Sequence, residues 1–122
     1  AVSNYLSNHP KIEKVFFPGT DKRHKEIAEK QMDGFGGMMS FVIDSDINGV
    51  KTFLKNLNLF TLAESLGGVE SLIEHPAIMT HASIDPSIRE KLGISETLLR
   101  ISVGIEDVDD LISDLDQALS KI

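Results

Sequence analysis

Cysteine is absent from the 122 residues of the chain. Its absence excludes disulfide bonds, thiolate metal sites and cysteine nucleophiles. A cysteine-free chain fits the reducing cytoplasm, which is the location we expect. Tryptophan is also absent, and aromatic residues make up 6% of the chain without basic residues gathered around them. A surface for stacking nucleic-acid bases is therefore not indicated.

Basic residues are scarce, and long apolar runs are missing. The chain has 12 Lys and Arg against 19 Asp and Glu, which gives a formal net charge of −7. Binding to a phosphate backbone needs clustered Lys and Arg. No apolar run approaches the roughly 20 residues that span a bilayer. We therefore expect neither nucleic acid nor a membrane as a partner.

The length and composition indicate one soluble globular domain, residues 1–122, with 41% hydrophobic and 25% charged residues. The first residue is Ala1 rather than Met, and Val2, Tyr5 and Leu6 already show helical spacing. The sequence begins as if inside a helix, so we expect the chain to be a piece of a longer protein.

Apolar runs that end at Pro or Gly predict strands, and the i, i+3, i+7 spacing predicts helices. The expected strands are 15–17, 38–43, 59–63 and 98–103. The expected helices are 1–9, 24–32, one after Asp44-Ser45-Asp46, a short one between Asp85 and Gly93, and one from about Asp107. This order predicts an α+β two-layer sandwich. About four mainly antiparallel strands would carry helices on one face, which leaves the other face free to dock on another domain.

Arg100 is the charged residue of Leu98–Val103, a segment otherwise composed like a strand. A guanidinium within an apolar strand costs free energy unless an anion or strong acceptors meet it. Because its planar fork can bind both oxygens of a carboxylate, Arg100 is a candidate for holding a substrate carboxylate. The alternative is an edge-strand arginine that faces water or pairs with a nearby Glu or Asp.

Ser65 and two glycines, in Glu64-Ser65-Leu66-Gly67-Gly68, directly follow the third expected strand. Glycines allow a ligand to approach the backbone closely, and a serine hydroxyl could bind a carboxylate. The alternative is a strand-to-helix turn with a capping serine. The spacing matches neither a nucleophile elbow nor a nucleotide-binding glycine loop.

The histidines and the acidic residues lack the spacing of metal sites. His75 and His81 bracket a short apolar segment, and hydrogen-bonding roles suit them better than metal ligation. The acidic cluster of Glu106, Asp107, Asp109 and Asp110 lacks the spacing and the glycine of a calcium loop. Negative charge at the start of the last helix explains it more simply, so we expect no metal.

Three segments, taken together, point to one protein family more specifically than any one of them does alone. They are Phe60–Gly68 (FTLAESLGG), Glu74–Ala82 (EHPAIMTHA) and Leu99–Asp107 (LRISVGIED). In this order they closely resemble the small C-terminal domain of the Cys/Met-metabolism family of pyridoxal-phosphate enzymes. The likeness is greatest to the members that cleave or form cystathionine, and it extends over nearly the whole chain. It implies the small domain of an aspartate-aminotransferase-like fold.

The resemblance also implies roles for individual residues. Arg100 matches the arginine that binds the α-carboxylate of the substrate, and Ser65 matches a serine that assists it. Glu64 matches an acidic position near the distal part of the substrate, which bears on specificity. Thr80 matches a threonine of the active-site wall. The implied reaction is γ-elimination or γ-replacement on cystathionine or an O-acylhomoserine, in transsulfuration.

One departure from the family pattern limits what this chain can do. The family's cofactor-binding lysine lies in a Ser/Thr-x-Thr-Lys-type segment of the large domain, and no such segment occurs here. We therefore expect pyridoxal 5′-phosphate in the full enzyme, none on this chain alone, and no activity from the chain alone. The expected partners are the large domain and sister subunits of a homotetramer. The alternative is an autonomous, non-catalytic α+β module that binds a ligand or another protein.

Overall fold

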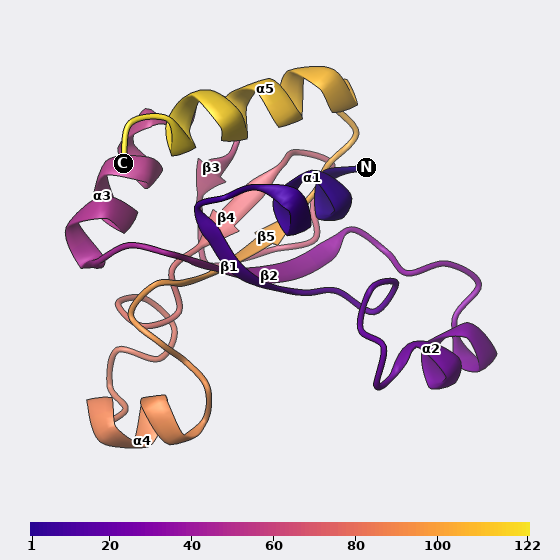
Figure 1. Cartoon of the computed structure of the whole chain (residues 1–122), viewed down its shortest axis with the longest axis horizontal. Coiled ribbons are helices and arrows are strands. Elements are labelled where there is room, and N and C mark those ends of the chain that lie inside the picture. Colours follow the sequence, from indigo (N-terminus) through magenta and orange to yellow (C-terminus); the bar gives the residue numbers. More distant parts are fainter.

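A five-stranded sheet in the order β1-β2-β5-β4-β3 forms the centre of the chain. The computed structural model describes residues 1–122. The strands are β1 (Ile12–Phe16), β2 (Met38–Ile43), β3 (Thr61–Leu62), β4 (Leu72–Glu74) and β5 (Leu98–Ser102). β2 pairs antiparallel with β1 and β5, β4 pairs antiparallel with β5, and β3 pairs parallel with β4. The last strand of the sequence, β5, is thus the central strand of the sheet (Figure 1).

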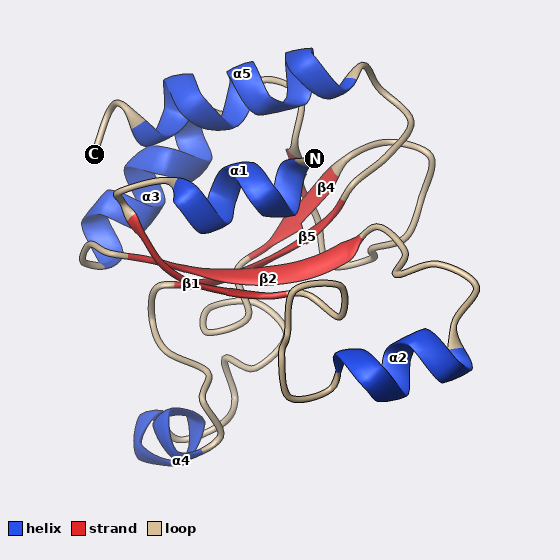
Figure 2. Ribbon diagram, turned by 45° about the vertical axis from the view of Figure 1, so that its right-hand side comes forward, coloured by secondary structure: helices blue, strands red, loops and turns tan.

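Three helices cover one face of the sheet, and two project from its other side (Figure 2). The helices are α1 (Val2–Asn8), α2 (Lys25–Gln31), α3 (Ile47–Asn56), α4 (Pro86–Lys91) and α5 (Val108–Leu119). The covering helices are α1, α3 and α5, and the buried core lies between them and the sheet. None of the helices combines the length and the apolar character that a membrane span requires. We call the sheet face away from α1, α3 and α5 the open face.

The predicted α+β fold with a mainly antiparallel sheet is confirmed, and the structure differs from the prediction in three details. The sheet has five strands rather than about four, because the segment expected as a loop contains β4. Helices were expected on one face, but α2 and α4 lie beyond the open face. The third strand is also shorter than expected, Thr61–Leu62 instead of 59–63.

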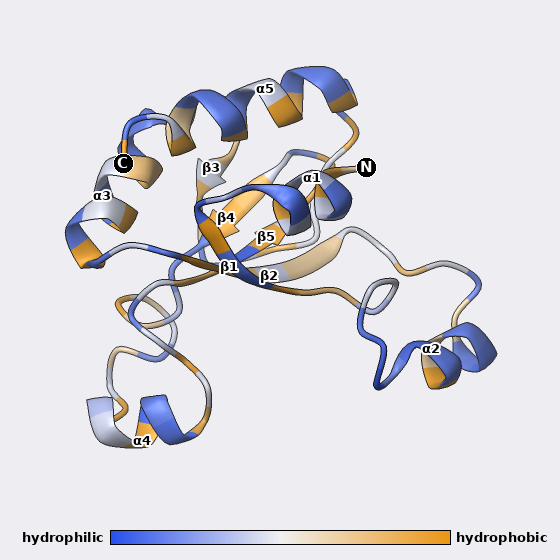
Figure 3. Ribbon diagram, viewed as in Figure 1, coloured by the Kyte–Doolittle hydropathy of each residue, from blue (hydrophilic) through white to orange (hydrophobic).

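Alternation along β2 directs its side chains to two different environments. Met39, Phe41 and Ile43 are buried beneath the helices, whereas their neighbours in sequence are half-buried on the open face. The helices follow their own period. In α5, Leu111 and Leu115 are buried, and hydrophilic residues face outward (Figure 3). The two periods produce a single core on one side of the sheet.

Acidic N-caps begin three of the helices. The sequence predicted the caps of α3 and α4, and for α5 it predicted only favourable negative charge at the start of the helix. Asp46 accepts hydrogen bonds from the backbone N–H groups that open α3. Asp85 caps α4, which has Pro86 in its first turn. Asp107 caps α5 by accepting from the N–H groups of Asp109 and Asp110. These carboxylates satisfy donors that have no partner within the helix.

Asp114 ties α5 to the segment that leads into β3. The carboxylate is 5% exposed. It accepts backbone N–H hydrogen bonds from Asn58 at 2.9 Å, Leu59 at 2.8 Å and Phe60 at 3.3 Å, and a side-chain bond from Gln117 at 3.1 Å. Burial raises the pKa of Asp114, but the N–H donors of Leu59 and Asn58 outweigh burial and leave the pKa below its ordinary value. The charged carboxylate is therefore the stable form. It accepts the backbone N–H bonds of residues 58–60, just before β3, where no strand pairing does so.

Replacing Asp114 by Ala should destabilise the fold by about 2–4 kcal/mol, because three backbone N–H donors would lose a charged acceptor. The measurement is urea unfolding at pH 7, where the carboxylate is ionised both folded and unfolded. Asp44→Asn is the matched control, since the Asp44 side chain is exposed, and it should change stability by less than about 0.5 kcal/mol. Equal stability of the two variants would contradict the role given to Asp114.

Candidate functional site

Arg100 lies on the open face at the middle of the sheet. Its neighbours Leu99 and Ile101 are completely buried under the helices, so alternation points Arg100 the other way, where it is exposed. The register places it opposite Ser40 of β2 and Glu74 of β4. Directly opposed residues of neighbouring strands share a face. Arg100 is thus flanked by a hydroxyl and a carboxylate across the two strands.

Arg100 forms no ion pair with Glu74 or any other acid, since the ion pairs of the chain are Asp21–His24 and Lys25–Glu29. The alternative of an edge-strand arginine is wrong, because β5 is the central strand of the sheet. The same alternative also predicted that Arg100 faces water, and this part is correct. The guanidinium therefore carries no burial penalty in this chain. Its donors remain available to an external acceptor.

Glu74 belongs to a short chain of polar side chains beside Arg100. It is 4% exposed and accepts a hydrogen bond from the Thr80 hydroxyl. The same Thr80 oxygen lies 2.8 Å from Nδ1 of His81. Because a hydroxyl has one proton and Thr80 gives it to Glu74, the His81 Nδ1 must be the donor to Thr80. The arrangement holds Thr80 against Glu74, the residue that lies opposite Arg100 in the sheet.

Glu64 and Ser65 lie in the connection between β3 and β4, which we call the 63–71 loop. Both side chains are exposed, and neither makes a hydrogen bond within the chain. The loop reverses at Gly67, whose φ of +94° falls in the region that glycine adopts most readily. The alternative of a strand-to-helix turn is wrong, because β4 follows this loop rather than a helix.

Buried serines join the 63–71 loop to the end of β5. The Gly67 N–H donates to the Ser102 hydroxyl oxygen at 2.8 Å. Ser71 donates to Glu106 twice, from its N–H at 2.7 Å and from its hydroxyl at 2.8 Å, and its hydroxyl oxygen accepts from the Gly104 N–H at 2.9 Å. We call the group of Ser71, Ser102, Gly104 and Glu106 the serine clasp.

Glu106 is the charged member of the serine clasp. The backbone N–H of Ser71 lowers the pKa of its carboxyl, and the Ser71 hydroxyl adds to the effect. Ser71 and Ser102 are 0% and 2% exposed, so their hydroxyls need these partners. The serine clasp therefore connects the loop of Ser65 with the strand of Arg100.

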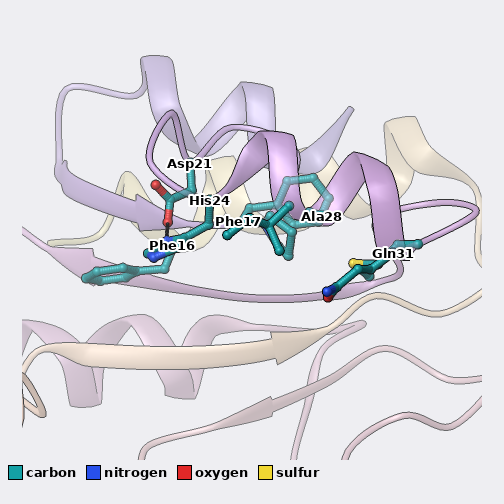
Figure 4. Close-up of a pocket in the computed structure, with 9 residues that line it drawn as sticks. Phe16, Phe17, Asp21, His24, Ala28 and Gln31 are labelled. Atoms are coloured by element: carbon teal, nitrogen blue, oxygen red, sulfur yellow. Dashed lines mark hydrogen bonds and ion pairs between the residues drawn. The ribbon is translucent and has the colours of Figure 1, made fainter.

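The surface cavities of the chain do not contain the predicted site residues Arg100, Ser65, Glu64 and Thr80. A groove of about 410 Å³ lies between Phe16 and Phe17 at the end of β1 and the inner side of α2 (Figure 4). At its edge the His24 Nδ1 lies 2.8 Å from an Asp21 oxygen. Arg100 lines neither this groove nor any of the four other cavities. Small-molecule sites are usually concave, so the residues around Arg100 do not form an enclosed site within this chain.

The residues present do not fit a site for a Schiff-base cofactor. Such a site needs a lysine close to the bound substrate. Every lysine of the chain is exposed or half-buried, and β2, β4 and β5, which surround Arg100, carry none. The strand lysine Lys14 is on β1, with its ammonium 4.6 Å from the centre of the Phe16 ring. No group of three or more His, Asp or Glu side chains is arranged to hold a metal ion.

His75 and His81 make hydrogen bonds, as expected. The Nε2 of His75 lies 2.8 Å from the Glu96 carbonyl oxygen and donates to it, which ties the end of β4 to the segment before β5. The ring is completely buried, and its Nδ1 has no partner. Burial lowers the pKa of His75 below its ordinary value, against the opposing effect of the Glu96 carbonyl. His75 is therefore a neutral, structural histidine.

Sequence reasoning missed several residues around Arg100. Glu74 was passed over because β4 has only three residues and was expected to be a loop. Ser102 could have been found, since it follows Arg100 by two positions and strand alternation puts both on one face. The pairing of Ser71 with Glu106 joins residues 35 positions apart, and no local pattern signals it.

The chain matches known proteins over almost all of its length. A family model described as Cys/Met metabolism PLP-dependent enzyme matches residues 1–120. The chain is 54% identical over 122 residues to a cystathionine gamma-lyase of Dictyostelium discoideum and 56% identical over 120 residues to one of Bos taurus. It is 52% identical over 121 residues to a cystathionine beta-lyase of Lactococcus lactis. These alignments cover 98–99% of this chain but only 30–32% of the relatives, so the chain spans about a third of their length.

Solved structures match the fold equally well. Two structures of cystathionine gamma synthase from Xanthomonas oryzae pv. oryzae superpose with a TM-score of 0.91 at 46% sequence identity. One is a complex with aminoacrylate and cysteine, and the other is a complex with cystathionine. Each match covers 98% of this chain and 31% of the other.

The stability of the chain should fall as the pH drops through about 6.5, the ordinary pKa of histidine. Because the folded-state pKa of His75 is lowered, the unfolded chain binds a proton that the folded chain does not take up until the pH is lower still. His75→Gln keeps a donor for the Glu96 carbonyl but cannot titrate. Its free energy of unfolding between pH 7.5 and 5.5 should depend less on pH than that of the wild type, and equal slopes would show that His75 is not the group responsible.

Proposed function

Since the chain belongs to the Cys/Met-metabolism family of pyridoxal-phosphate-dependent enzymes, we propose that it is the small domain that binds the substrate α-carboxylate in an enzyme of transsulfuration. The observation that carries the proposal is Arg100, an exposed guanidinium without an ion pair at the centre of the open face. The similar lyases and the synthase are named for cystathionine, which supports an amino-acid substrate of that class.

Arg100 would act by orienting the substrate. Its fork binds both oxygens of a carboxylate, which fixes the amino acid in position and in rotation. Placement on a central strand holds the arginine backbone through hydrogen bonds on both sides. A rigid element positions a functional group more accurately than a loop does. Orientation of this kind lowers the barrier because the reacting groups meet without a further entropy cost.

The other proposed contacts are Ser65, Glu64 and Thr80. The Ser65 hydroxyl would donate a second hydrogen bond to the carboxylate held by Arg100. The exposed carboxylate of Glu64 would attract a positive group on the distal part of the substrate and so favour cystathionine over shorter amino acids. Thr80, whose hydroxyl is fixed by Glu74, would form part of the wall beside the bound amino acid.

The reaction of the full-length enzyme would be γ-elimination or γ-replacement on cystathionine or an O-acylhomoserine. Pyridoxal 5′-phosphate supplies an electron sink in this chemistry. The lysine that bonds it would lie outside these 122 residues, in the large domain, so the chain alone would be inactive. The full-length enzyme would be a cytoplasmic homotetramer. An autonomous binding module is disfavoured, because the relatives that match the chain are three times its length.

Replacing Arg100 by Ala in the full-length holoenzyme should weaken substrate binding by about 30-fold or more, because the carboxylate loses a bidentate charged partner. Titration calorimetry with a non-reacting amino acid measures the affinity. The same titration with the corresponding amine, which lacks the carboxylate, should give equal affinities for the wild type and the variant.

Two controls define the result. Arg100→Lys keeps the charge but loses the fork, so it should bind with intermediate affinity. Arg23→Ala removes an exposed arginine from the segment before α2 and should leave binding unchanged. Unaltered affinity for the amino acid in Arg100→Ala would refute the assignment of the carboxylate site.

A further inference from the structure

We propose that Ser102 and Glu106 are positioning residues that hold the 63–71 loop, and with it Ser65, at a set distance from Arg100. The inference rests on the proposed function, because that function makes Arg100 and Ser65 the two contacts of one carboxylate. Neither Ser102 nor Glu106 touches the substrate in this proposal. They act through the serine clasp described above.

Only a short path through the chain separates Arg100 from Ser65. Ser102 follows Arg100 by two strand residues, which is about 6.6 Å along β5, and the alternation of the strand puts both on the open face. Gly67 follows Ser65 by two residues in the loop. The hydrogen bond from the Gly67 N–H to the Ser102 hydroxyl, 2.8 Å long, closes this path. Few backbone rotations therefore separate Arg100 from Ser65.

The 63–71 loop has few other contacts that restrict its conformation. Its ends join the sheet where the Thr61 N–H donates to the Ser71 carbonyl oxygen and the Ala63 N–H donates to the Ile73 carbonyl oxygen. Between these ends the backbone is largely exposed, and the Val69 side chain is 68% exposed. A loop without buried apolar contacts samples many conformations unless hydrogen bonds restrict it. The bond to Ser102 is thus the first restraint after Ser65, as far from Ser65 in sequence as the Ala63 bond that precedes it.

The C-terminal side of the loop is fixed by several hydrogen bonds and by a close backbone approach. Ser71 uses its N–H, its hydroxyl proton and its hydroxyl oxygen at once, the first two toward Glu106 and the last toward the Gly104 N–H. The Ile105 N–H donates to the Val69 carbonyl oxygen at 2.9 Å. A Cβ at Gly104 would overlap that carbonyl oxygen, so only glycine permits the approach. Glu106 therefore anchors the far side of the same loop.

These contacts predict an effect on substrate binding rather than on the chemical step. A more mobile loop would leave Arg100 in place. Ser65 and Glu64 would then lose conformational entropy when the substrate binds, which lowers the affinity. Losing one hydrogen bond of this kind corresponds to about a fivefold to tenfold change in affinity. Ser102→Ala should raise KM by that factor and change kcat less.

The experiment uses the full-length holoenzyme with Ser102→Ala and Glu106→Gln. The amino-acid affinity is measured by titration calorimetry, KM and kcat by steady-state kinetics, and amide exchange by mass spectrometry. Exchange should accelerate in 64–70 and stay unchanged in β2. Ser120→Ala is the matched control, since it removes an exposed serine hydroxyl at the end of α5 and should leave all of these quantities unchanged.

A double-mutant cycle separates positioning from general stability. If Ser102 acts through the loop, Ser102→Ala should lose its effect on affinity in a background where Glu64 and Ser65 are already Ala. An effect that persists in that background would overturn the proposal. If Ser102→Ala does not fold, the same cycle with Glu106→Gln decides, because Glu106 is only half-buried.

The two proposals fail in different ways. Normal affinity and normal loop exchange in Ser102→Ala, together with weak binding in Arg100→Ala, would overturn the positioning role and leave the carboxylate site standing. Normal amino-acid affinity in Arg100→Ala would refute the proposed function and, with it, the positioning role.

Discussion

The two-sided character of β5 is the constraint on which the rest of this structure depends. Leu99 and Ile101 complete the core beneath α1, α3 and α5, while Arg100 and Ser102 face away from that core. A shift of one residue in register would bury the guanidinium and expose both aliphatic side chains, so the core specifies the register strongly. The position of the candidate carboxylate site is thus set by the same packing that stabilises the domain.

The polar residues near the open face come from separate parts of the sequence. The 63–71 loop comes from between β3 and β4, Thr80 from the segment after β4, and Glu106 from the turn into α5. Ser102 joins the loop to β5, Glu74 joins Thr80 to β4, and Glu106 accepts hydrogen bonds from Ser71 at the end of the loop. Hydrogen bonds suit this side because it lacks the covering helices that exclude water from the core. A hydrophobic core positions strands well, but directional bonds are needed to place individual loops.

Much of the fold was predictable from local patterns. The buried strand β2, the amphipathic helices, the acidic caps of α3 and α4 and the negative charge at the start of α5 depend on residues close together in sequence, and they appear where predicted. β4 was missed because three residues between turns carry too little pattern. The placement of α2 and α4 beyond the open face was missed because helical periodicity describes a helix and not the layer in which it lies.

The sequence by itself determined the family resemblance, the α+β class and the candidates Arg100, Ser65, Glu64 and Thr80, because each rests on a contiguous segment. The tertiary structure alone decided that β5 is central, that Arg100 faces outward without an ion pair, and that Glu74 lies opposite it. It also joined Ser71 to Glu106 across 35 positions. Strand order and long-range hydrogen bonds depend on how the whole chain packs, which no local spacing encodes.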